Sequence, residues 1–408
     1  MNRKLIFNSS VLVTLLVIYL FGILVWDYTW VYRIALVLLL IVFLIVRKGK
    51  VAVAHRPFFL TSFLLFIYFV SHTLLGFSKN NALSKSYLVT LFINLVAILL
   101  CENIIDSEKT LERIMRSWII ISFLMSLYII IMDRSNLFSG NLGSHVTKPF
   151  TSSLYSHNDI ALIAAFAIAF IGYFVNKKTI PKSSVIIQLF FLVFIILTGA
   201  RKSLLIAMAG FILYPLIFNG KRGPKKWVNV AIACIGVVAM FYLVLNNELL
   251  YRLIGNRFAG YFSGLSGGSF TESSALTRSV MRETAWRAIR EKPFWGWGLN
   301  TFRTFPGSYG TWSHVNYLEL WVSGGVIPVV IYYSFYGYAV FNLIKKRHNT
   351  NTSLNGLFLM LMFCMVIMDY LSVTYVSRMI GFIYCMVDAY IFHGLNKQAS
   401  ENGVKQND

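Results

Sequence analysis

Two apolar runs near the N-terminus decide the fold class. Residues Leu5–Val25 read LIFNSSVLVTLLVIYLFGILV, and residues Tyr28–Val46 read YTWVYRIALVLLLIVFLIV. Each run has roughly the 20 mostly apolar residues that an α-helix needs to cross a bilayer. The first run is longer than the core of a signal peptide, and no small-residue cleavage site follows it. We therefore expect it to remain in the protein as the first membrane span.

The rest of the chain continues this pattern. Hydrophobic residues make up 57% of its 408 residues and charged residues only 13%, against roughly 25% charged residues in a typical soluble protein. The alternating segments of a transmembrane barrel are absent, so the sequence predicts an all-α, multi-pass integral membrane protein. Ten further apolar runs bring the predicted spans to about twelve: Phe58–Leu75, Ser86–Leu100, Ser117–Met132, Asp159–Val175, Ser183–Leu197, Ser203–Phe218, Trp227–Leu245, Asn316–Phe341, Leu354–Ser372 and Met379–Phe392.

The basic residues predict the orientation of these spans. The formal net charge is +21, and most Lys and Arg residues of the short loops fall on the same side as the N-terminus. Cytoplasmic loops of membrane proteins carry this excess, so we expect both termini in the cytoplasm. Basic loops beside anionic headgroups also account for the charge without a nucleic-acid partner.

One large loop interrupts the series of spans. Its front half contains a Gly/Ser-rich run, Ser263–Ser269, which predicts a flexible lid or linker. Its second half, Leu276–Lys292, has good helix formers and ends before a proline, so it predicts a helix on the outer surface. The chain then divides into nine spans, the extracytoplasmic loop, three spans and a cytoplasmic tail: residues 1–245, 246–315, 316–393 and 394–408.

Polar residues gather at the predicted outer ends of the spans. Arg201 and Lys202 lie in a short turn on the side where basic residues are rare. They could snorkel to lipid headgroups, with Ser203 capping the next helix. They could equally bind phosphate, because the guanidinium is a planar fork, the ammonium is a point charge, and the N–H groups of the next helix point the same way.

The predicted outer helix adds further arginines. Arg278 and Arg282 are four residues apart and share a face, and Trp286 continues that face from Arg282. A basic face lying on anionic lipid explains Arg287 and Arg290. For Arg282 we favour a functional role, because the Trp neighbour and the aromatic run after the helix would hold it in a packed setting and suit stacking against sugars.

Two more candidates lie where the chain is predicted to enter the membrane. His314 precedes the tenth span, and its ordinary titration range fits either a structural hydrogen bond or a functional role. The arginines nearby favour the functional role. Asn158 precedes the sixth span in a Ser-His-Asn-Asp run, which also fits an ordinary helix N-cap.

The motifs of several other protein classes are absent. The sequence has no phosphate-binding loop, dinucleotide fingerprint, zinc-protease motif or outer Asp-x-Asp pair, and its four cysteines lack metal-ligand spacing. Acidic residues inside the predicted spans are few, which argues against a proton-coupled carrier. We therefore expect no metal and no cofactor, and an outer site of arginines, a histidine and aromatic residues that suits a lipid-linked anion.

Three motifs resemble those of the O-antigen ligase/polymerase family of bacterial polysaccharide assembly. They are LTGARKSL at Leu197–Leu204, RETAWRA at Arg282–Ala288 followed by PFWGWGLNTF at Pro293–Phe302, and HVNYLE at His314–Glu319 followed by GGVIP. A valine separates the family's His-Asn pair here. Pro328 replaces the second glycine of the family's Gly-x-x-Gly pattern, which suggests a kinked tenth span.

The resemblance implies a metal-independent glycosyltransferase on the outer face of the bacterial cytoplasmic membrane. Its donor would be a glycan on an undecaprenyl diphosphate carrier. Arg201 and Arg282 would stabilise the departing diphosphate, with Lys202 and Arg278 in support. His314 would either accept the proton of the acceptor hydroxyl or donate to the diphosphate. Further substrate contacts are expected from Asn158, Asn316 and Glu319.

The resemblance leaves three activities open. A polymerase joins one lipid-linked repeat unit to another, as in capsular, exo- or O-antigen polysaccharide, whereas a ligase transfers the finished glycan to lipid A core or another surface acceptor. A transporter or flippase of lipid-linked sugars forms no bond. The continuation Tyr317–Glu319 favours the polymerase. Expected partners are the lipid-linked oligosaccharide, membrane lipids, and the flippase and chain-length regulator of the same pathway.

Overall fold

The computed structural model describes residues 3–26, 30–48, 50–51, 56–134, 137, 146–147, 154–155, 157–210, 273–346 and 352–404, with a few single residues between 231 and 255. In this part of the chain the fold is helical apart from one short antiparallel pair, β1 (Val146–Thr147) with β2 (Leu154–Tyr155). The all-α class is therefore confirmed. The Gly/Ser-rich run and nearly all of the span Trp227–Leu245 lie outside the described residues.

Most predicted spans are helices with limits close to the predicted ones. Within the described ranges, seven helices are long and apolar enough to cross a membrane, while the predicted total of twelve stays a prediction. With the helices outside that set of seven included, the helices of the bundle are α1 (Arg3–Val25), α2 (Trp30–Arg47), α3 (Pro57–Leu74), α4 (Asn81–Ile104), α5 (Glu108–Met132), α7 (His157–Asn176), α8 (Val185–Leu197), α9 (Arg201–Met208), α15 (Val326–Lys346), α16 (Thr352–Leu371) and α17 (Arg378–Val404).

The predicted tenth span, Asn316–Phe341, is wrong as a single helix. The chain forms a short helix, α14 (Asn316–Gly324), and then starts α15 in a new direction after Gly325. Gly325 has φ +76°, and a Cβ there would lie 1.9 Å from the carbonyl oxygen of Phe294, so only glycine fits. The predicted kink at Pro328 is also misplaced, because this proline lies in the first turn of α15, where a ring is tolerated.

Helix α7 forms the centre of the membrane-embedded bundle. Its residues from Ile160 to Phe174 are almost all buried, and it packs against α5, α8, α9 and α16. Alanines such as Ala164 and Ala169 let neighbouring backbones approach closely, as is typical of helices packed within membranes. Trp118 of α5 is fully buried there and donates its indole N–H to the carbonyl of Ile163 at 3.0 Å. Helix α9 runs parallel to α7, which brings the first residues of both helices to the same end.

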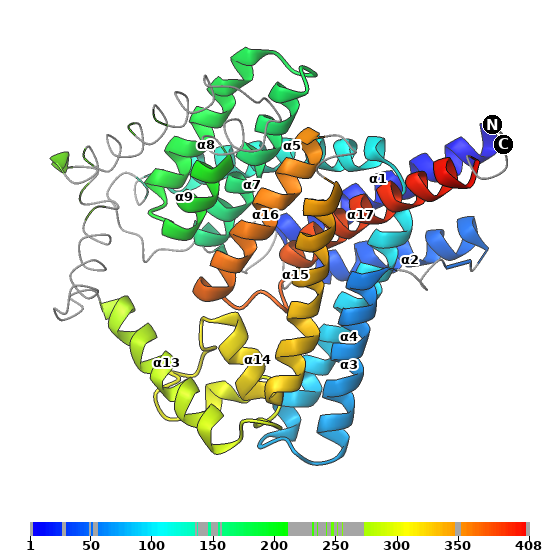
Figure 1. Ribbon diagram of the computed structural model, residues 1–408. Helices are drawn as coiled ribbons and strands as arrows, with labels where there is room; N and C mark the ends of the chain where they lie inside the picture. The colour runs from blue at the N-terminus through cyan, green and yellow to red at the C-terminus, as the bar shows by residue number, and fades with distance from the viewer. Residues whose placement is uncertain are drawn as a thin grey trace.

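A second unit, the α13–α14 module (residues 273–325), rests on the ends of α3 and α4. It contains α13 (Ser273–Glu291), a 3-10 turn (Phe302–Thr304) and α14 around a small core of its own. The helix predicted at Leu276–Lys292 is thus present as α13, while its place on the outer surface stays a prediction. In Figure 1 the blue helices α3 and α4 extend from the bundle to the level of the yellow-green α13 and yellow α14.

Hydrogen bonds join this module to the α3–α4 hairpin. The Tyr68 hydroxyl donates to the carbonyl of Gly324, the Ser84 hydroxyl donates to that of Leu299 at 2.9 Å, and the N–H of Lys79 donates to Trp297 at 2.6 Å. Gly298 has φ +108°, and a Cβ there would lie 2.2 Å from the Ser78 hydroxyl. The glycine therefore permits the close contact between loop and hairpin.

Candidate functional site

The structure brings four of the predicted site residues together from separate elements. The Ser203 hydroxyl of α9 donates to the backbone carbonyl of Asn158 at 3.4 Å, which places Lys202 beside the start of α7. Burial and the nearby charges of Arg278 and Lys202 lower the pKa of His314 to about 4. The starts of α7 and α9, helix α13 and the turn before α14 therefore meet in one cationic cluster, formed by Asn158, Lys202, Arg278 and His314.

The start of α9 supplies the charges on one side of this cluster. Arg201 and Lys202 are its first two residues, and Gly199 makes the turn before them with φ +63°. Ala200 precedes the helix and offers no side-chain cap, so the first N–H groups of α9 have no partner from that residue. Burial and the Arg278 guanidinium lower the pKa of Lys202, while Asp159 acts in the opposite direction. Negative charge placed here meets two cationic side chains and a helix N-terminus.

Arg282 lies one turn further along α13 than Arg278. Its guanidinium donates to the hydroxyl of Tyr370 at 2.8 Å, and its carbon atom lies 5.8 Å from the centre of that ring. Tyr317 of α14 is the other aromatic neighbour: burial and Tyr370 raise its pKa, and the Arg282 charge opposes the shift. Two tyrosines from α14 and the end of α16 thus flank the Arg282 guanidinium.

His314 is held in an unusual backbone conformation. Its φ is +58°, in the left-handed region that a residue with a side chain adopts only when its surroundings require it. The surroundings are a tight turn: the Ser313 N–H donates to Glu319 at 2.8 Å, and the Ser313 hydroxyl donates to the carbonyl of Val315 at 3.0 Å. The turn therefore fixes the backbone position of His314 near the cluster's cations, whose charges lower its pKa.

Glu319 lies beneath this turn. It is 1% exposed, one carboxyl oxygen accepts from Ser313, and the other has no hydrogen-bond partner within the described ranges. Burial raises its pKa to about 7, against the opposing effects of Ser313 and Arg303. The contacts give Glu319 a role in holding the His314 turn, while its predicted contact with substrate stays a prediction.

Asn316 is also committed to contacts within the protein. Its side-chain oxygen accepts the backbone N–H groups of Thr374 and Tyr375 at 2.9 and 3.0 Å, and its amide donates to the Tyr333 hydroxyl at 3.3 Å. Tyr333 in turn donates to buried Asp369 at 2.8 Å. Asn316 therefore anchors the α16–α17 connection to the start of α14, and its predicted substrate contact also stays a prediction.

The comparison with known families falls on this part of the chain. A family model described as O-antigen ligase matches residues 186–333, which include α9, α13 and α14. The match over this segment supports an O-antigen ligase/polymerase family protein. No curated protein has a matching sequence.

O-antigen ligase/polymerase family proteins are membrane glycosyltransferase-like enzymes, and the several apolar helices of this chain agree with a multi-pass membrane protein. The matched segment contains every predicted catalytic residue: Arg201, Arg282 and His314. Of the predicted substrate residues, Asn158 precedes it. Over the described ranges, no group of three His, Cys, Asp or Glu side chains is placed to hold a metal ion.

Sequence reasoning missed the two tyrosines near Arg282, Tyr317 and Tyr370. Tyr370 ends an apolar helix, where an aromatic residue is indistinguishable by pattern from one that faces lipid. In the sequence, Tyr317 stands out only within the motif that begins at His314 and in its continuation to Glu319. The signal that could have found it is spacing, because Tyr317 lies three residues after His314 and so falls on the first turn of the helix that His314 precedes.

Proposed function

We propose that this protein is a polymerase of oligosaccharide repeat units carried on undecaprenyl diphosphate, working on the outer face of the bacterial cytoplasmic membrane. The observation that carries the proposal is the convergence of Lys202 and Arg278 on His314, with Arg201 and Arg282 adjacent along the same two helices. Such a site offers several fixed cations and one potential base. The flippase and chain-length regulator of the same pathway would be its partners.

The reaction needs stabilisation of charge on the leaving group. A hydroxyl oxygen of the acceptor sugar attacks the anomeric carbon of the donor, the bond from that carbon to the diphosphate oxygen breaks, and its electron pair leaves with the lipid diphosphate. Arg201 and Arg282 would bind the diphosphate, with Lys202 and Arg278 beside them. Fixed guanidinium groups in a site with little water stabilise this charge without reorganising during the reaction.

His314 is suited to accept the proton of the acceptor hydroxyl. With a pKa of about 4 in the free protein, its imidazole is neutral near pH 7 and can act as a base. A diphosphate bound between the cations would offset their repulsion and raise the pKa of His314, which favours proton uptake at the moment when the donor is present. The Glu319-bonded turn would keep the imidazole in place.

A ligase is the second candidate, because the matching family model carries that description. The chemistry at the diphosphate would be the same, and only the acceptor would change to lipid A core or another surface glycan. A transporter of lipid-linked sugars would use neither a base nor a leaving-group site.

The test uses purified protein in liposomes that contain only lipid-diphosphate-linked repeat units. A polymerase should build a ladder of longer lipid-linked chains with no nucleotide sugar added and with chelator present. A ladder that appears only after an acceptor such as lipid A core is supplied, or single transfer to that acceptor, would favour the ligase. No new glycosidic bond under either condition would exclude both enzymes.

Matched variants test the residues. Arg201→Ala, Arg282→Ala and His314→Ala should each slow product formation by about a hundredfold or more, because a charge-assisted contact made in the transition state contributes about 3 kcal/mol. Arg287→Ala is the control, since this residue lies on the same helix as Arg282, is exposed, and pairs with exposed Glu283 at 3.6 Å. Equal activity of the variants and the control at matched protein levels would contradict the assignment.

A further inference from the structure

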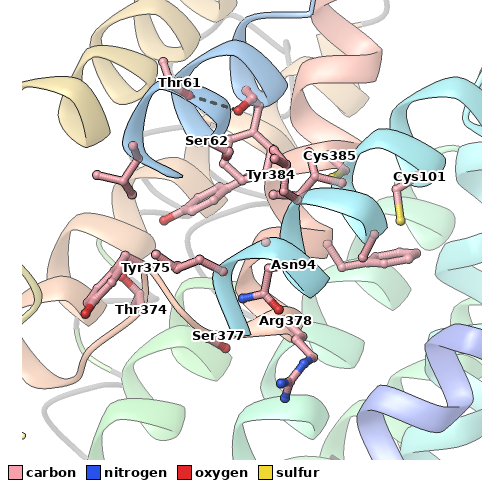
Figure 2. Close-up of a pocket in the computed structure, with 18 of the residues that line it drawn as sticks. Thr61, Ser62, Asn94, Cys101, Thr374, Tyr375, Ser377, Arg378, Tyr384 and Cys385 are labelled. Atoms are coloured by element: carbon pink, nitrogen blue, oxygen red, sulfur yellow. Dashed lines mark hydrogen bonds between the residues drawn. The ribbon is translucent and has the colours of Figure 1, made fainter. Parts of the chain in front are cut away.

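One face of α3 is apolar and exposed from end to end. The opposite face lines a cavity with α4 and α17, and Figure 2 shows Thr61 and Ser62 on that side. The exposed side chains are spaced three or four residues apart, which makes one stripe along an α-helix. They are Leu60, Leu64, Ile67, Ser71 and Leu74. Because α3 is long and apolar enough to cross a membrane, this stripe is expected to face lipid.

The stripe continues past the end of α3 onto the α13–α14 module. Leu75 follows α3 directly, and Phe77 comes two residues later. The ring of Phe77 stacks on that of Trp295 in the module, with the ring centres 5.4 Å apart and the planes at 8°. Phe294 and Trp295 are large apolar side chains, yet they are 66% and 52% exposed. Together these exposed residues form an apolar ledge: Leu74, Leu75, Phe77, Phe294 and Trp295.

Backbone contacts hold the ledge at the ends of two spans. On one side, Nε2 of the buried His72 of α3 donates to the carbonyl of Trp295 at 2.6 Å. On the other side, the N–H of Val326, the first residue of α15, donates to the carbonyl of Pro293 at 3.1 Å. Val330, one turn later on α15, is exposed and apolar like the stripe of α3. The ledge therefore lies where α3 leaves the apolar layer and α15 enters it.

Two lysines lie beside the ledge. Lys292 precedes it in the sequence, and the Nζ of Lys292 lies 4.1 Å from the centre of the Trp297 ring. The Nζ of Lys79 lies 5.5 Å from the same ring and 4.0 Å from that of Phe305. Exposed aromatic rings next to ammonium groups are typical of the boundary of a bilayer, where the rings lie at headgroup depth and the lysines reach the phosphates.

The composition of the ledge favours lipid over sugar. Sugar rings also stack on exposed aromatic side chains, but a sugar site needs polar groups beside the ring to bind the hydroxyls. The other members of the ledge are leucines and a phenylalanine, and the surface that continues from it is the apolar stripe of α3. Of the aromatic run that follows α13, the first two rings thus match a lipid surface, while Trp297 packs within the module.

We propose that the apolar ledge inserts into the bilayer on the side of the α13–α14 module and anchors the module there. Ordinary phospholipids would contact the ledge through their glycerol and upper acyl region, and their phosphates would meet Lys79 and Lys292. Helix α13 ends at Glu291, two residues before Pro293, so the anchor would hold this end of α13 at the membrane boundary. The anchor is independent of the proposed polymerase activity.

The experiment measures the depth of single nitroxide labels in liposomes of phosphatidylethanolamine and phosphatidylglycerol. The full-length protein carries one new cysteine in a background in which its four native cysteines are replaced. Leu75→Cys and Phe294→Cys report on the ledge, and Ile67→Cys is the reference in the stripe of α3. Glu283→Cys is the matched control, because Glu283 is an exposed charged residue of the same module and pairs with Arg287. All four sites are exposed, so none of the substitutions should impair folding.

Collisions with oxygen, which concentrates in the bilayer, are compared with collisions with a water-soluble nickel chelate. Oxygen should dominate at the two ledge sites, as at Ile67→Cys, whereas the chelate should dominate at Glu283→Cys. Chelate dominance at both ledge sites would overturn the proposal. Low collision rates with both reagents at the ledge would show that a second copy of the chain covers it, which would also overturn the proposal.

A second measurement uses the wild-type protein. An apolar carbene precursor dissolved in the bilayer and activated by light should label residues 293–297 severalfold more strongly than residues 279–290 of α13. Equal labelling of the two segments would contradict the anchor. Protection of residues 293–297 by a soluble oligosaccharide would show a sugar platform and overturn the proposal. Neither measurement contains a glycan substrate, so a failed polymerase assay with a lipid-inserted ledge would contradict only the proposed function.

Discussion

Replacing Asn316 separates an anchoring role from a substrate contact. In Asn316→Ala, the two N–H groups of Thr374 and Tyr375 lose their shared acceptor in a buried place. Each unsatisfied buried N–H costs about 1–3 kcal/mol, so the variant should lose about 2–6 kcal/mol of stability. Asn316→Asp keeps the acceptor oxygens, but it loses the donor to Tyr333 and adds a charge near Asp369. It should therefore be destabilised as well.

The assay compares how much protein survives a series of heating steps in detergent, as monodisperse material on size exclusion. Asn342→Ala is the control, because Asn342 lies on α15 and, among the described residues, its amide donates to the carbonyl of Tyr338, one turn earlier in the same helix. Asn316→Ala should lose heat resistance and activity together, and the control should lose neither. If Asn316→Ala survived heating like the wild type and only raised KM, the anchoring argument would be refuted and a direct substrate contact supported.

Three further predictions concern the site. Tyr370→Phe should slow product formation by about tenfold at normal abundance, because the Arg282 guanidinium loses its hydroxyl partner. Tyr309→Phe, at an exposed tyrosine of the α13–α14 module that carries Arg282, should leave the rate unchanged, and equal rates for the two variants would contradict a role of Tyr370 in positioning Arg282. On the acid side of its pH profile, kcat/KM should fall with a midpoint near pH 4, which is the lowered pKa of His314. A midpoint near the ordinary pKa of 6.5 would contradict a neutral His314 in the free protein. The pKa of Glu319 is raised from its ordinary value of 4.5 to about 7, so the stability that its protonated form contributes is fully present below pH 4.5 and is lost as the pH rises through 7. Heat resistance should therefore decline between pH 4.5 and 7 in the wild type, and it should decline less in Glu319→Gln. Parallel declines in the two proteins would refute this.

Much of the helical framework could be predicted because its signal is local. Apolar runs predicted α1, α2, α3, α7 and α8 within a few residues, whereas α5 begins nine residues before its predicted start at Ser117. The spacing of Arg278 and Arg282 placed both on one face of α13. The break at Gly325 could not be predicted in this way. A glycine in an apolar run is compatible with a continuous helix, and what forbids the helix here is the distant carbonyl of Phe294.

In the candidate site, too, the residues with a local sequence signal could be predicted and the contacts between distant residues could not. Motif and charge singled out the cations and His314, since basic residues at the predicted outer ends of spans are unusual, and the structure places Lys202 and Arg278 near His314. Their catalytic roles stay a prediction. The contacts of Asn316 and Glu319 were not predictable, because polar residues beside a histidine fit a substrate contact as well as a backbone contact. Only the positions of Thr374 and Ser313 show that their side chains hold loops.

The attachment of the α13–α14 module to the α3–α4 hairpin has a consequence for biosynthesis. The hairpin residues that contact the module, from Tyr68 to Ser84, precede Pro293 by about 200 positions in the sequence. At roughly 5–20 residues per second, the hairpin leaves the ribosome on the order of ten to forty seconds before the module does. The α13–α14 module is therefore synthesised after the α3–α4 hairpin, and it can dock onto a hairpin that has already folded. We expect substitutions in the α3–α4 hairpin that weaken these contacts to impair the folding of the α13–α14 module, which lies far downstream in the sequence.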